Sequence, residues 1–163
     1  TPCYSTNFDY FAVNGEDNIT GISQVDDSWR RRICEWLFNV VDHFNFEREV
    51  VLITLNYLDR AASIETKKLG KGINPREYQL IGITCFYIAM KLHGEPSSDI
   101  NNAYRGKLKT EAFVELSHGL LTIELLEDKE REILQMLEWR VNPPLASTII
   151  AYLLHFLPNV RIS

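Results

Sequence analysis

Histidine and cysteine are the residues of this chain whose side chains most often bind metals or carry out catalysis. The four histidines lie far apart along the sequence, at His43, His93, His118 and His155. The three cysteines are equally scattered, at Cys3, Cys34 and Cys85, and no Cys/His pair has the spacing of a zinc site. No phosphate-binding Gly-x-x-x-x-Gly-Lys motif occurs at Gly70–Gly72, and no nucleophile motif lies near a histidine. The sequence therefore predicts no enzyme, metal or cofactor, and leaves catalysis only to a triad assembled across distant elements.

The charged residues give a mildly acidic chain. Its 163 residues include 17 Lys and Arg against 22 Asp and Glu, for a net charge of -5. The short basic runs at 30–32 and 67–71 are interpreted as solvated or structural charges, because nucleic-acid modules normally carry a Lys/Arg excess. The apolar run Leu80–Met90 is far shorter than the ~20 residues of a membrane span. We therefore expect an intracellular chain whose partner is a protein, without nucleic acid or membrane.

Two amphipathic or apolar segments in the first half of the chain predict helices. The first segment, residues 29–44, has apolar residues at the spacing of one helical face, with Asp27 or Ser28 as its expected N-cap. The second, Val50–Ala62, is apolar nearly all round until Asp59, so we expect a helix with little exposed surface.

The strongest helix start in the sequence is Asn74-Pro75, which combines an N-cap residue with a proline at the first helical position. The apolar run Tyr78–Met90 follows, and Lys91 and His93 complement the helix C-terminus, while Gly94 suits a left-handed cap. The pattern predicts a buried central helix.

The rest of the chain predicts further helices and no strand. A polar loop over 95–109 precedes a short helix at 110–118, a longer helix at 122–139 and an amphipathic stretch from Pro143 onward. Val50–Leu55 and Ile83–Ile88 could also be read as buried parallel strands, but each run continues into helix-compatible residues. We therefore expect an all-α fold of five or six helices.

Several ordered motifs resemble the N-terminal cyclin box of cell-cycle cyclins. They are Trp29–Leu37, Asn56–Arg60, Gln79–Cys85, Ile88–Lys91, and a Glu nine residues ahead of Trp139. The resemblance implies a cyclin-like five-helix bundle around a buried central helix, spanning residues 26–142. It also implies an N-terminal arm at 1–25 and the start of a second, C-terminal box at 143–163.

The same resemblance implies a partner, a cyclin-dependent protein kinase catalytic subunit that the chain binds and activates in the nucleus and cytoplasm. Lys91 and Glu130 match the family's Lys and Glu that bind the kinase's regulatory helix and turn a catalytic Glu inward. The alternative interpretation is structural: Lys91 would complement the dipole at a helix end, and Glu130 would lie on a solvated helix face. The family's apolar contacts with the kinase correspond here to Ile88, Leu92, Leu134, Trp139 and Val141.

Two further groups of residues are carried over by the resemblance. Arg30 and Asp59 would form a buried ion pair, and removing one partner would lower the stability of the fold by about 3–5 kcal/mol. Arg60 is a second candidate partner for Asp59. The groove that takes Arg-x-Leu substrate or inhibitor peptides corresponds to Trp29, Arg32, Ile33, Trp36, Asn39 and Gln79.

This docking groove is degenerate, because Arg32 replaces an apolar residue and Asn39 an acidic one, so we expect weakened or altered docking. The alternatives to a kinase activator are a cyclin-box scaffold and a transcription-factor-like protein that binds partners without activating a kinase.

Overall fold

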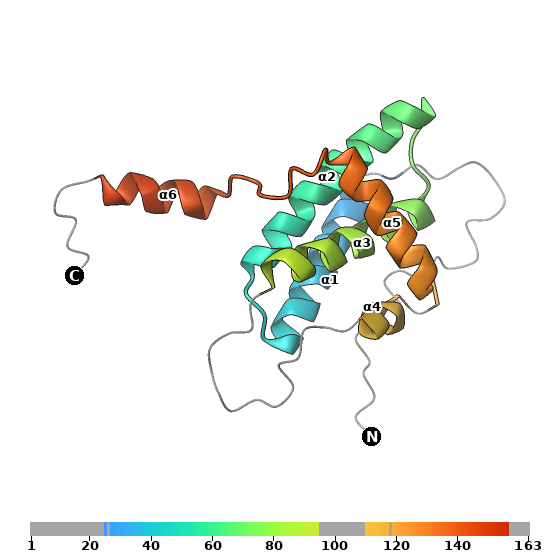
Figure 1. Ribbon diagram of the computed structural model, residues 1–163, viewed down its shortest axis with the longest axis horizontal. Coiled ribbons are helices and arrows are strands. Elements are labelled where there is room, and N and C mark those ends of the chain that lie inside the picture. The colour runs from blue at the N-terminus through green and yellow to red at the C-terminus, as the bar shows by residue number, and fades with distance from the viewer. Residues whose placement is uncertain (1–24, 26, 95–109, 118, 157–163) are drawn as a thin grey trace, which may run out of the picture.

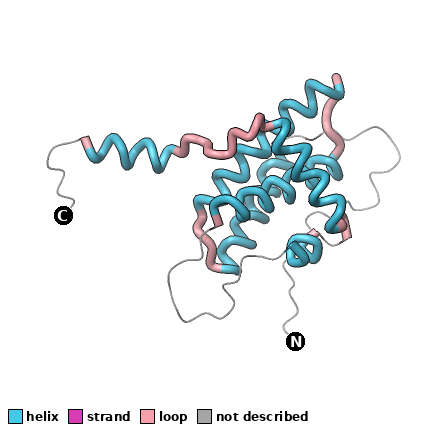
Figure 2. Tube along the Cα trace, in the orientation of Figure 1, coloured by secondary structure: helices cyan, strands magenta, loops and turns pink. Residues whose placement is uncertain are grey.

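The computed structural model describes residues 25, 27–94, 110–117 and 119–156 (Figure 1). The expected polar loop at 95–109, and all of the expected N-terminal arm except residue 25, lie outside these residues. The described residues form six helices: α1 (Asp27–Phe44), α2 (Glu49–Leu69), α3 (Pro75–His93), α4 (Thr110–Leu116), α5 (Ile123–Met136) and α6 (Ala146–His155). The described part of the chain contains no strand (Figure 2), so the all-α expectation is confirmed and the competing sheet is wrong.

Helix α3 lies at the centre of the bundle. Every residue from Tyr78 to Met90 is buried, and α1, α2, α4 and α5 all pack against this helix (Figure 1). A helix that is apolar all round needs such an enclosed position, since no face of it gains from contact with water. The expected bundle around a buried central helix is therefore confirmed.

Local capping explains where α3 and α5 begin. The Asn74 side chain accepts a hydrogen bond from the Glu77 backbone N–H at 2.8 Å, and the Thr122 hydroxyl accepts one from the Leu125 N–H at 3.2 Å. At the other end of α3, Gly94 has φ −72°, so the expectation of a left-handed cap is wrong. The left-handed glycine cap is instead Gly70, at the end of α2.

Several helix boundaries differ from the expected ones, among them those of α1, α2 and α5. Helix α1 begins at Asp27, so both of its expected cap residues lie inside the first turn. Helix α2 continues to Leu69, past the expected end at Ala62. Helix α5 ends at Met136 and not at Trp139, because Glu138 and Trp139 adopt left-handed φ values of 53° and 58°.

Helix α6 extends away from the bundle at the end of a linker (Figure 1), and none of its residues is buried. Its hydrogen bond to the bundle runs from the Ser147 hydroxyl to the Glu49 carboxylate, at 2.9 Å. No helix among the described residues is long and apolar enough to cross a membrane.

Candidate functional site

An ion pair between α3 and α5 occupies one surface of the bundle. Lys91 lies in the last turn of α3, and its ammonium donates to both carboxylate oxygens of Glu130 on α5, at 2.8 and 3.1 Å. The Lys91 side chain is 53% exposed and that of Glu130 is 15% exposed. The hydrogen bond to Glu130 raises the pKa of Lys91, against a smaller opposing effect of burial.

The Lys91–Glu130 pair can accept further partners. An ammonium has three N–H donors, and a carboxylate has about four lone-pair positions, so one ion pair does not use them all. The Lys91 ammonium also lies 5.3 Å from the centre of the Tyr87 ring, which limits its orientation. The site therefore offers a donor and an acceptor side by side at a partly exposed position.

The apolar residues expected beside this pair differ in their exposure. Leu92 is 50% exposed and Trp139 is 66% exposed, and both are large side chains open to a partner. Leu134 and Val141 are partly buried. Ile88 is only 1% exposed and belongs to the core, so its expected place on a contact surface is wrong in this structure.

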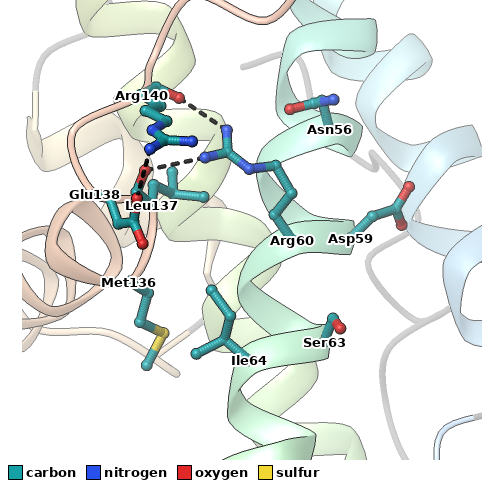
Figure 3. A pocket seen from close by; sticks show the side chains of 9 residues that line it. All are labelled: Asn56, Asp59, Arg60, Ser63, Ile64, Met136, Leu137, Glu138 and Arg140. Carbon is teal, nitrogen blue, oxygen red and sulfur yellow. Dashed lines mark hydrogen bonds and ion pairs between the residues drawn. The ribbon is translucent and has the colours of Figure 1, made fainter.

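The segment after α5 is held by side chains for which the sequence predicted no such contact. Arg60 of α2 donates to the carbonyls of Arg140 at 2.8 Å and Leu137 at 2.9 Å (Figure 3). Tyr57 donates its hydroxyl proton to the Val141 carbonyl, and His93 Nε2 donates to the same oxygen at 2.9 Å. The sequence carried little signal for these contacts, because the acceptors are main-chain carbonyls, which every residue has.

The comparison with protein families now decides what this bundle is. The model described as "Cyclin, N-terminal domain" matches residues 7–142, which is most of the chain. The chain belongs to the cyclin family.

Several cyclins are similar to this one. The G2/mitotic-specific cyclin S13-6 of Glycine max is 27% identical over 141 residues, covering 86% of this chain and 27% of that protein. The G1/S-specific cyclin-E of Drosophila melanogaster is 28% identical over 114 residues, covering 70% of this chain and 14% of that protein. The G1/S-specific cyclin-D1 of Homo sapiens is 34% identical over 65 residues, covering 40% of this chain and 20% of that protein. The chain thus spans less than a third of the length of each of these relatives.

The residues expected to form the docking groove of this cyclin lie on α1 and α3. Its apolar members Ile33 and Trp36 are buried, as is Gln79, whereas Arg32 and Asn39 are exposed. The Arg32 guanidinium lies 5.3 Å from the centre of the Trp29 ring, so it covers the groove's remaining half-buried aromatic side chain. Arg32 therefore presents a positive charge at a position where the resemblance implies an apolar side chain.

The ion pair between α1 and α2 has two-pronged geometry. Arg30 Nε and Nη2 each donate to one carboxylate oxygen of Asp59 at 2.8 Å. The two side chains are 47% and 46% exposed, so the expectation of a buried pair is wrong. Asp59 pairs with Arg30 and not with Arg60, because Arg60 turns toward the carbonyls after α5.

The cysteines and histidines form no metal site in the part of the chain that the structure describes. Cys34 and Cys85 are free thiols, and complete burial strongly raises the pKa of Cys85. A thiol held in its neutral form is a poor nucleophile and metal ligand. His93 is bonded to Tyr57 and Val141, while His118 and Cys3 lie outside the described residues.

Proposed function

We propose that this chain is a regulatory subunit that binds a cyclin-dependent protein kinase catalytic subunit and switches it on. The observation that carries the proposal is the partly exposed pairing of Lys91 with Glu130, and the large apolar side chains of Leu92 and Trp139 are exposed as well. Mixed polar and apolar surfaces of this kind suit protein partners, whose contacts combine apolar anchors with oriented hydrogen bonds. Relatives named for G1/S and G2/mitotic roles support the class of function.

In the proposed complex, the Lys91 ammonium donates to main-chain carbonyls of the kinase's regulatory helix, and the Glu130 carboxylate accepts from main-chain or Lys N–H groups. Leu92 and Trp139 fill apolar depressions beside them. Binding in this way turns the kinase's catalytic Glu inward, so the chain acts as a regulator and not as an enzyme. We place this activity in the nucleus and cytoplasm, with no requirement for a cofactor, nucleic acid or membrane.

The experiment that tests the proposal mixes the chain with a panel of purified cyclin-dependent kinases and measures complex formation and phosphorylation of a histone-type substrate. Wild type should bind and activate at least one kinase. The Lys91→Ala/Glu130→Ala variant should lose about tenfold or more in affinity, because both oriented contacts disappear.

Asp128 and Arg131 provide the matched control, since they form an exposed ion pair at 3.2 Å on the same helix α5. The Asp128→Ala/Arg131→Ala variant also removes one charge of each sign and should behave as wild type. A chain that binds kinases without activating them would be a scaffold. A folded wild-type chain that binds no kinase, or binds DNA instead, would contradict the proposal.

A further inference from the structure

The turn after α5 adopts a backbone conformation that its residues do not favour. Glu138 and Trp139 are consecutive, neither is glycine, and both have left-handed φ values, 53° and 58°. Side chains with a Cβ rarely adopt this region, and a bulky residue such as tryptophan does so only where its surroundings impose it. The conformation of this turn therefore needs an external cause.

Arg60 of the neighbouring helix α2 bonds to the main chain on both sides of the two left-handed residues. Its two terminal nitrogens donate to the carbonyls of Leu137 and Arg140, which flank the two left-handed residues (Figure 3). The carbonyls at the end of a helix have no partner within the helix, so they are available as acceptors. A planar guanidinium holds its donors in a fixed fork, which sets the spacing between the two carbonyls.

The neighbouring contacts leave Arg60 free for this role and fix the turn at its far end. Asp59, the nearest carboxylate in sequence, is occupied by both prongs of Arg30. Beyond the turn, the Val141 carbonyl accepts from Tyr57 and His93. The chain is thus held on both sides of Trp139.

These contacts fix the position of the main chain at Trp139. The side chain is 66% exposed, so the strained turn does not serve to bury it in the core. Exposed tryptophans held by rigid backbone make strong anchors, since little conformational freedom is lost on binding.

We propose that Arg60 is a positioning residue that holds the turn at Leu137–Arg140 so that Trp139 is presented to the kinase. This inference rests on the proposed function, because it names a determinant of the same kinase-binding surface. Arg60 itself need not touch the kinase.

The first measurement needs no kinase. Amide hydrogen exchange is recorded for the full chain as wild type and as Arg60→Gln. The Arg140 N–H, which donates to the Leu137 carbonyl at 3.0 Å, should exchange about tenfold faster in the variant, while amides in the core of α3 stay unchanged. Arg31→Gln, on an exposed arginine of α1, should leave both groups of amides unchanged.

The second measurement is a double-mutant cycle on binding to whichever kinase of the panel the wild type activates. Arg60→Gln should weaken binding about tenfold in the wild-type background and less than about twofold in a Trp139→Ala background. Arg60→Lys should resemble Arg60→Gln, because lysine keeps the positive charge but lacks the two terminal nitrogens that donate in a fixed geometry. It serves as the second variant if Arg60→Gln fails to fold.

The outcomes separate the two proposals. If Arg60→Gln weakens binding equally with and without Trp139, or leaves binding unchanged, Arg60 does not act through Trp139 and the inference is overturned. If Arg60→Lys binds the kinase like wild type, Arg60 contributes to binding through its charge and not by positioning the turn, and the inference is also overturned. If no kinase binds the wild type, the proposed function fails, even where hydrogen exchange shows that Arg60 holds the turn.

Discussion

Arg30 and Asp59 illustrate how exposure sets the value of an ion pair. If the pair were buried, removing one partner would lower the free energy of unfolding by about 3–5 kcal/mol, because an unpaired charge would remain in an apolar environment. Both side chains are about half exposed, however, so water solvates whichever charge is left. The two-pronged geometry aligns α1 with α2 more than it stabilises the fold.

We therefore predict a small effect for Asp59→Asn. The free energy of unfolding, measured by urea denaturation, should fall by about 1 kcal/mol. Asp42→Asn, which breaks the more exposed pair between Asp42 and Arg48, should have a smaller effect. A loss of more than about 3 kcal/mol for Asp59→Asn would show that the pair behaves as a buried one.

Tyr57 gives a prediction on pH. Burial raises the pKa of Tyr57 to about 12, whereas an unfolded tyrosine ionises near about 10. The unfolded chain therefore releases this proton first, and the stability that the neutral hydroxyl contributes is present below about pH 10 and lost as pH rises toward 12. Urea denaturation between pH 9 and 12 should show this decline.

Tyr57→Phe removes the titrating group and provides the control. Its free energy of unfolding should be about 1 kcal/mol lower at pH 8, because the Val141 carbonyl loses the Tyr57 hydrogen bond. Its decline above pH 10 should be shallower by about 1 kcal/mol per pH unit. Parallel curves for wild type and variant would mean that Tyr57 ionises equally in both states.

At the scale of the elements, the packing of α1 on α3 depends on a glycine. A Cβ built on Gly82 would lie 2.9 Å from the terminal methyl group of Ile33, closer than real contacts allow. Alanine favours the helix by about 1 kcal/mol over glycine, so two opposing effects meet at this position. The balance depends on how far the Ile33 methyl can move.

A double-mutant cycle isolates this contact. Ile33→Val removes the terminal methyl, so Gly82→Ala should be more favourable by about 1 kcal/mol in that background than in wild type. Thermal or urea denaturation of the four proteins measures the coupling. Additive effects would show that the two helices have room for a Cβ at residue 82.

The helices themselves followed from local signals in the sequence. The N-cap at Asn74 and the all-round apolar run after it predicted α3, and apolar spacing predicted α1. The end of α5 was wrong because Arg60, distant in sequence, imposes the left-handed turn at Glu138 and Trp139. Periodicity carries no information about a contact between a guanidinium and main-chain carbonyls.

The candidate site was only partly predictable for the same reason. Lys91 and Glu130 are 39 residues apart, and no local pattern says that α3 and α5 bring them together. The resemblance named both residues, but not that they bond to each other. Ile88 was placed on the surface because a helical apolar residue can face either way, and only the packed structure shows its burial.

At the scale of the whole molecule, the bundle presents surfaces of different chemistry. The ion pair of Lys91 and Glu130 lies partly exposed between α3 and α5, whereas α1 presents Arg32 beside the Trp29 ring. Helix α6 exposes apolar residues throughout, among them Tyr152 and Leu153, which is typical of an element that packs against a further part. We interpret α6 as the start of the second box.

The α1 surface gives a prediction on partner choice. An Arg-x-Leu peptide should bind weakly to wild type in a direct titration, because Arg32 repels the incoming Arg and covers Trp29. Arg32→Leu should tighten binding about tenfold by removing that cation. Equal affinity for wild type and variant would show that Arg32 does not govern docking.

If Lys91 and Glu130 contact a kinase, exchanging their charges should abolish activation. The Lys91→Glu/Glu130→Lys variant keeps an ion pair between α3 and α5 but reverses the donor and the acceptor shown to a partner. Kinase activity is measured with wild type and with this variant at equal concentration, after thermal denaturation has shown that both are folded. We expect wild type to activate the kinase and the exchanged variant not to activate it. Equal activation by both would contradict this contact, because the pair would then serve only to join the two helices.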